Sequence, residues 1–219
     1  MTSRFIFTFL LTIVYCSAAG FSGGVEYKSD YLFRGVTQSD HTHALQGRAR
    51  YGFNNGFYIG AFASNIYDPK EDKNNAIEYD FSLGLLGEAK DVWFEAGAIS
   101  YNYTIKDSNF LELLFAVGYG GFRLAVYTTV GADDSNAIGD RYLETSLDLI
   151  DVMDLVDIGF GAGYAIPNDQ NANKPLNLYA SISKTFSSKT SVGVRSELYS
   201  RNAKDFDKAR YFIFAKQSF

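Results

Sequence analysis

The chain of 219 residues contains a single cysteine, Cys16. One thiol cannot build a disulfide framework or a thiolate metal site. Proline is scarce as well, with three residues, and after the N-terminus no stretch approaches the 18 apolar residues of a membrane-spanning helix. The formal net charge of −5 disfavours nucleic acid as a partner. Any membrane span of this chain must therefore be made of strands.

The N-terminus predicts a secretory signal peptide over residues 1–19. Arg4 supplies its positive charge, residues 5–15 form its apolar segment, and residues 17–19 form a small-residue cleavage site. Tyr15 stands before Cys16 where a bacterial lipidation site has Gly or Ala, which argues against lipidation. We therefore expect one exported domain over residues 20–219.

Aromatic residues and glycine are abundant, with 16 Tyr, 19 Phe and 20 Gly. They lie in segments where apolar and polar residues alternate, which is the period of a β-strand. The clearest segment places Ile77, Tyr79, Phe81 and Leu83 on one face and polar residues on the other. Twelve strands are predicted, over residues 24–34, 45–53, 57–65, 77–85, 92–103, 111–119, 122–129, 142–149, 156–166, 176–186, 192–198 and 209–219.

The connections between these segments alternate in length. Long polar loops follow the first, third, seventh, ninth and eleventh segments; short turns follow the second, fourth, sixth, eighth and tenth; the link after the fifth is intermediate. This order predicts an all-β fold, an up-and-down antiparallel transmembrane β-barrel of about 12 strands. A soluble barrel would show the same alternation. The aromatic-rich apolar face and the lack of a free sheet edge favour the membrane.

The last segment ends on an aromatic residue. Tyr211, Ile213, Ala215 and Phe219 share one face, while Arg210, Lys216 and Ser218 share the other. A terminal strand with a final Phe resembles the signal by which bacterial outer-membrane barrels are assembled. The expected partners are accordingly the outer-membrane lipid bilayer and, through Phe219, the barrel assembly machinery.

A stretch near the N-terminus carries a family resemblance. It comprises residues 29–39, with the sequence SDYLFRGVTQS, followed by ALQG at 44–47, GFYIG at 56–60 and Ser64-Asn65. This pattern is similar to that of the proteobacterial TorF family of porin-like proteins, also called Gcw_chp, although Thr37 stands where that family usually has Ser. The resemblance implies an outer-membrane barrel with a porin role, and it implies no catalytic residues.

If the polar face lines the lumen, its charges divide by strand. The last two and first two strands are mostly basic, and strands four to nine are mostly acidic. We expect a basic wall opposite an acidic wall, whose transverse field would orient dipolar solutes. The alternative is that the charges pair and plug a narrow barrel. The predicted pore-lining residues are Lys28, Asp30, Arg34, Arg48, Arg50, Glu78, Asp80, Glu112, Glu144, Asp148, Arg195 and Arg210.

Within this set, Asp30 and Arg34 lie four residues apart on one face of the first strand. Arg34 could bind an anionic group of a solute. The structural interpretation is an ion-pair network that holds the first loop.

His41 and His43 are the two histidines, and both lie in the loop after the first strand. They could bind a metal or serve an outer-membrane hydrolase, but no third ligand or suitably placed serine is evident.

Two further patterns have structural interpretations. The glycines of 159–163 lie inside an alternating strand and would relieve crowding in the lumen. Tyrosines near strand ends would form interfacial girdles: Tyr31, Tyr51, Tyr58, Tyr101, Tyr103, Tyr119, Tyr164 and Tyr199.

These observations predict an outer-membrane channel for passive diffusion of small hydrophilic solutes, without catalysis, metal or cofactor. The alternatives are a non-conducting barrel whose outer loops bind a partner and, less favoured, an outer-membrane hydrolase.

Overall fold

The computed structural model describes residues 19–186 and 189–219. The predicted signal peptide therefore lies outside the described residues, except for Ala19. Within them, no helix is long and apolar enough to cross a membrane.

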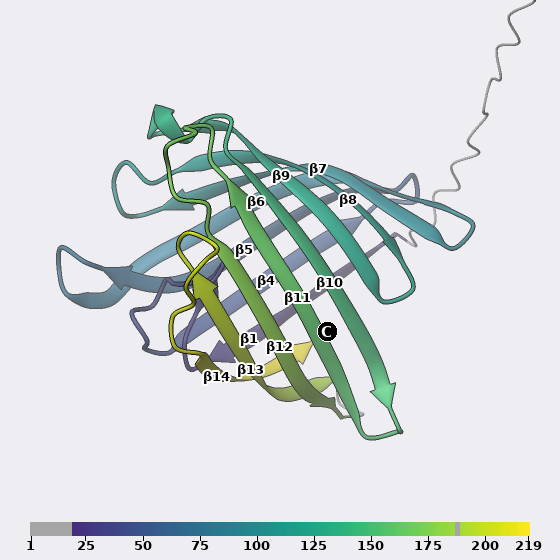
Figure 1. Ribbon diagram of the computed structural model, residues 1–219. Helices are drawn as coiled ribbons and strands as arrows, with labels where there is room; N and C mark the ends of the chain where they lie inside the picture. Colours follow the sequence, from purple (N-terminus) through teal and green to yellow (C-terminus); the bar gives the residue numbers. More distant parts are fainter. Residues whose placement is uncertain (1–18, 187–188) are drawn as a thin grey trace, which may run out of the picture.

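Twelve strands of the described residues close into one antiparallel barrel (Figure 1). Their order around the barrel is β1, β14, β13, β12, β11, β10, β9, β8, β7, β6, β5 and β4. The predicted class and strand number are confirmed. The barrel strands are β1 (Gly20–Lys28), β4 (Ala44–Gly52), β5 (Phe57–Asp68), β6 (Lys73–Ala89), β7 (Val92–Tyr103), β8 (Phe110–Tyr119), β9 (Phe122–Ala132), β10 (Arg141–Val152), β11 (Val156–Ile166), β12 (Leu176–Thr185), β13 (Thr190–Ser200) and β14 (Arg210–Ser218).

The remaining elements lie in connections. β2 (Leu32–Phe33) and β3 (Val36–Thr37) form a separate two-stranded hairpin, and η1 (Ser135–Ala137) is a single helical turn capped by the side chain of Asp134. The chain enters and leaves the barrel at one end, because Gly20 pairs with Gly52 of β4 at the start of the first short turn. In outer-membrane barrels this is the periplasmic end, and the longer loops lie at the outer end.

The closing seam pairs β1 with β14. Five residues of β1, from Gly24 to Lys28, pair with Ser218 to Phe214. Gly23 and Phe219 extend the ladder through two backbone hydrogen bonds, of 3.2 and 3.0 Å, and the ring of Phe219 stacks on Phe21 at 6.0 Å. The predicted terminal strand thus seals the sheet.

The outer surface of the barrel is apolar. Phe81, Leu83 and Phe115 keep 58, 53 and 54% of their surface exposed although they sit in the middle of strands. A water-soluble barrel would bury this face, so these side chains require an apolar surrounding. Their neighbours on alternate positions, such as Glu78 and Glu112, are buried inside. This inside-out distribution places the protein in the outer membrane.

Two strand predictions are wrong. The first strand ends at Lys28 rather than near residue 34, and the chain beyond it turns into the barrel. The third connection, predicted as a long loop, is a hairpin in which β5 continues to Asp68 and β6 starts at Lys73. The first strand was predicted too long because the chain leaves the barrel wall although its residues still alternate. The third connection was predicted as a loop because its residues are polar, yet β5 and β6 continue through them by hydrogen-bonding to each other.

Candidate functional site: the lumen and its inward hairpin

The first outer loop folds into the barrel rather than over its rim. It comprises residues 29–43, contains the β2–β3 hairpin and is called here the inward hairpin. Its base is buried: Tyr31 keeps 7% of its surface exposed and packs with Ala44, Ile66 and Ala76 of the barrel wall. Tyr31 was predicted to be an interfacial residue, and that prediction is wrong.

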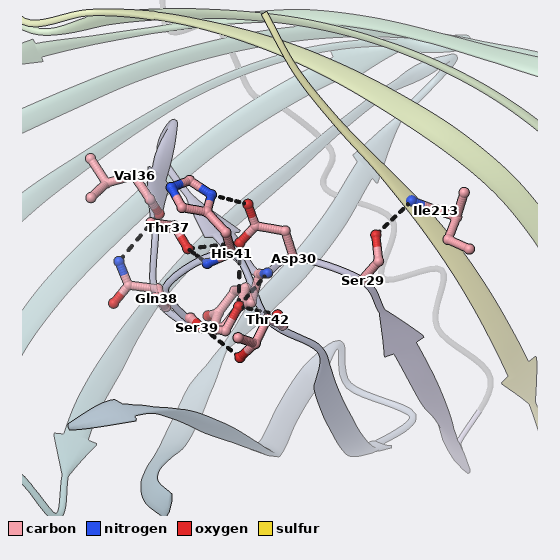
Figure 2. A network of polar contacts seen from close by, with 10 residues as sticks. Ser29, Asp30, Val36, Thr37, Gln38, Ser39, His41, Thr42 and Ile213 are labelled. Atoms are coloured by element: carbon pink, nitrogen blue, oxygen red, sulfur yellow. Dashed lines mark hydrogen bonds and ion pairs between the residues drawn. The ribbon is translucent and has the colours of Figure 1, made fainter. Parts of the chain in front are cut away.

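Asp30 is the centre of a polar network at this base (Figure 2). Its carboxylate accepts hydrogen bonds from the Thr37 hydroxyl at 2.7 Å and from Nδ1 of His41 at 2.9 Å, and the Ser39 hydroxyl oxygen lies 3.3 Å away. Oγ of Ser39 also accepts the backbone N–H of Tyr31 at 3.0 Å. One buried carboxylate thereby ties the two ends of the inward hairpin together.

Arg34 stands at the tip and reaches the far wall. Its Nη1 and Nη2 donate to the two carboxylate oxygens of Glu112 on β8, at 2.8 and 2.7 Å. The guanidinium carbon also lies 4.2 Å from the ring centroid of Tyr142 and 5.0 Å from that of Tyr127. A bidentate pair flanked by rings is a rigid, strongly held contact.

Gly35 fits the tip against a second part of the wall. Its φ of +85° is a left-handed conformation, and an added Cβ would lie 2.6 Å from Cδ2 of Tyr199 on β13 and 2.9 Å from Cβ of Asn177 on β12. Only glycine meets both conditions. The inward hairpin therefore starts at β1, touches β8 and β10 through Arg34, and touches β12 and β13 through Gly35.

The lumen wall is organised so that rings lie flat against it. A Cβ at Gly163 would collide with the hydroxyl of Tyr142, and one at Gly161 would collide with the ring of Tyr179. The predicted role of the 159–163 glycines, relief of crowding inside the barrel, is confirmed. Arg195 in turn stacks on Tyr179, with 3.6 Å between guanidinium and ring centroid.

The charged residues predicted on the wall face the lumen in several pairs. Arg50 of β4 lies 3.7 Å from Glu95 of β7, and Arg123 of β9 lies 2.7 Å from Glu144 of β10. On the basic side, Arg48 lies 3.2 Å from Glu26, and Arg195 lies 3.3 Å from Glu197.

Other predicted residues occupy special positions. Glu78 is 1% exposed and accepts a hydrogen bond of 3.0 Å from the Tyr103 hydroxyl, and Asp80 is buried beside it on β6. Lys28 lies 4.0 Å from Glu26 on β1. Asp148 faces Gly159 across the β10–β11 pair, and Arg210 lies opposite Glu197.

The placement of Asp30 and Arg34 on a strand is wrong. Asp30 lies in the network of the inward hairpin instead of on a lumen wall, and Arg34 pairs with the acidic wall instead of adding to the basic one. The physical reason is that the backbone leaves the sheet after Ser29, whose side chain accepts the N–H of Ile213 on β14 at 3.1 Å.

Sequence reasoning also missed residues of the lumen. Four further tyrosines assigned to the membrane interfaces, Tyr58, Tyr101, Tyr103 and Tyr199, belong to the interior. Two glycines could have signalled inward-facing rings, because glycine on a lumen face leaves room for a ring from the next strand. They are Gly84, which pairs with Tyr58, and Gly163, where an added Cβ would meet the hydroxyl of Tyr142. Tyr51 and Tyr119 are exposed on the outside, as predicted.

The histidines do not form a hydrolytic site. His41 contacts Asp30, but the Ser39 hydroxyl donates to the backbone carbonyl of Thr42 at 2.6 Å. The ring of His43 does not join them and stacks on the ring of Tyr27, with 6.3 Å between the two centroids. Among the described residues, no group of three potential ligands could hold a metal ion.

The inward hairpin separates two cavities at the outer mouth. One, of about 420 Å³, is lined by Arg34, Glu112, Tyr142 and Tyr199; the other, of about 440 Å³, is lined by Thr37, Ile66, Tyr67 and Tyr103. Phe33 and Phe110 border both. On the periplasmic side of Tyr31, a smaller cavity of about 190 Å³ lies between Glu26, Lys28 and Arg48.

Residues 15–150 match a protein family described as "Bacterial protein of unknown function (Gcw_chp)". The match spans more than half of the chain. This protein belongs to the Gcw_chp family. The predicted family is thereby confirmed, while the porin role attached to the name TorF stays a prediction, because the family's description assigns no function. No curated protein sequence matches the chain.

Solved structures share the fold of this Gcw_chp protein. A KdgM porin superposes with a TM-score of 0.62 at 12% identity, over 90% of this chain and 99% of the porin. A KdgM porin in complex with disordered oligogalacturonate gives a TM-score of 0.59 at 10% identity, over 91% of this chain and 98% of the porin. At these identities the likeness concerns the fold.

Proposed function

We propose that this Gcw_chp protein is an outer-membrane channel for passive diffusion of small hydrophilic solutes, as the TorF resemblance implies. One observation carries the proposal: charged side chains that face the lumen keep much of their surface accessible. The side chains of Arg48, Arg50 and Arg195 are 47, 38 and 31% exposed although they point inward. A lumen filled by paired charges would bury them.

The mixed charge of the wall supports a solute that need not carry one sign of charge. Arg50 of β4 pairs with Glu95 of β7, Arg34 of the inward hairpin pairs with Glu112 of β8, and Arg48 and Arg195 have acidic partners on the basic side itself. KdgM, which shares the fold, was solved with oligogalacturonate. For this chain we propose small polar solutes that diffuse through water, with no catalytic step and no cofactor.

Single-channel conductance in planar bilayers tests the proposal. The wild-type barrel should show steady openings, and the Arg48→Glu/Arg50→Glu double variant should shift the reversal potential under a salt gradient toward cation preference, because it reverses two charges that face the lumen. Lys70→Glu, a reversal in the exposed β5–β6 turn, is the control and should shift it much less. A correctly folded wild-type barrel that never conducts would overturn the proposal.

The alternative of a non-conducting barrel that binds a partner through its outer loops has one observation in its favour. The inward hairpin crosses the mouth and is pinned at both ends. Under that alternative, the wild-type chain stays silent in bilayers while a variant with a released hairpin conducts.

A further inference from the structure

The inward hairpin is a structured part of the channel mouth rather than a loose loop. Both outer-mouth cavities are bordered by it, so a solute that enters the lumen from either cavity passes beside Phe33 and Gln38. Its backbone is tied to the wall as well, because the N–H of Tyr67 on β5 donates to the carbonyl of Gln38 at 2.8 Å.

Resting on the proposed function, we infer that the inward hairpin is the constriction of the channel and that the Arg34–Glu112 pair sets its charge selectivity by keeping it neutral. The positive charge of Arg34 pairs with Glu112 of β8, which lies 78 positions away in the sequence. Glu112, which is 2% exposed, neutralises that charge through two short bonds. The constriction therefore carries no net charge at this pair and selects mainly by size.

This arrangement defines the solute class. A net-neutral gate lined by Phe33, Tyr142 and Tyr199 accepts small molecules that are uncharged or zwitterionic, and polar enough to travel in water. Larger molecules are stopped because Gly35 holds the tip against Tyr199 and Asn177, leaving the mouth divided in two.

Substitutions can give the Arg34–Glu112 pair a net positive or a net negative charge. Glu112→Gln leaves the guanidinium uncompensated, so the channel should prefer anions; Arg34→Met keeps much of the bulk but leaves Glu112 uncompensated, so the channel should prefer cations. The charge-swapped double variant Arg34→Glu/Glu112→Arg restores neutrality and should return the reversal potential toward the wild-type value. A hairpin that served stability alone would give both single variants the same change, with no opposite shifts in selectivity.

A third variant tests the size of the constriction. Gly35→Ala adds a methyl group at a position with φ of +85° and 2.6 Å from the Tyr199 ring, so the tip should leave its seat. We expect unitary conductance to rise about twofold as the two cavities merge. The matched control is Gly47→Ala, where nothing lies within 4 Å of the added Cβ. Folding of every variant is checked by heat-modifiable mobility in gels.

The outcomes separate this inference from the proposed function. If the wild type conducts and the variants at positions 34, 35 and 112 all behave like it, the constriction lies elsewhere and the channel remains. If the wild type is silent and Gly35→Ala conducts, the hairpin is the barrier and the open-channel function is wrong. If neither the wild type nor any released variant conducts, both are overturned.

Discussion

Asp30 shows how a single buried carboxylate can hold a loop inside a channel. It is 7% exposed and accepts hydrogen bonds from Thr37 and His41. Asp30→Asn replaces one acceptor oxygen by an NH₂ group that faces a donor. We expect this to cost about 1–3 kcal/mol in the free energy of unfolding, the usual penalty for an unsatisfied buried polar group.

Urea unfolding of the refolded barrel measures this loss, and limited proteolysis of the inward hairpin locates it. Asp40→Asn makes the same change at an exposed position of the same loop and should leave both readouts near the wild-type values. Equal behaviour of the two variants would contradict the central role of Asp30.

At the scale of the element, the β1–β14 seam closes the barrel with a short ladder next to a chain end. Phe219 extends it through backbone bonds to Gly23 and stacks its ring on Phe21. Phe219→Ala keeps the backbone but removes the ring, so the fraction of chains that form a heat-modifiable barrel should fall. Phe186→Ala, another half-exposed aromatic near a strand end, is the control.

We also propose that the assembly machinery reads this strand. Packing of the Phe219 ring and its recognition by the assembly machinery can be separated by experiment. If the ring acts through packing, Phe219→Ala lowers the folded fraction both in detergent refolding and in cells. If it acts as a recognition signal, the loss is confined to cells. Normal yields in both settings would show that neither the packing nor the signal depends on the terminal ring.

Strand alternation was enough to predict most of these elements. β6 keeps one apolar and one polar face over most of its length, so its orientation could be read directly. The alternation around Asp30 and Tyr31 led to the wrong prediction that the first strand continues through them. A hairpin inside a lumen contacts the same mixture of polar groups and rings as the wall does, so its sequence shows the same pattern. Local pattern contains no signal that distinguishes the two cases.

At the scale of the whole molecule, the contacts that build the gate depend on closure. Arg50 of β4 meets Glu95 of β7 because the wall curves over the strands between them, and Arg34 meets Glu112 because the barrel brings β8 opposite the hairpin that follows β1. Period two indicated which face of a clearly alternating strand such as β6 points inward, but it did not identify the inward tyrosines or the hairpin residues. It also could not indicate which inward residues meet across the lumen, because partners far apart in the chain are set by strand order, tilt and loop path.

The last prediction follows from the position of the apolar side chains on the outside of the barrel and of the polar ones inside. Ala49 lies on the outer surface, in a groove of about 500 Å³ lined by Phe21, Ile59 and Phe81, while its neighbour Arg48 faces the lumen. In a Trp93→Phe background, which removes the only tryptophan, Ala49→Trp should be quenched strongly by brominated lipids and Arg48→Trp weakly. Iodide, a water-soluble quencher, should give the opposite order for a water-filled lumen. Strong lipid quenching at position 48 would mean that the polar face, not the apolar one, contacts the bilayer.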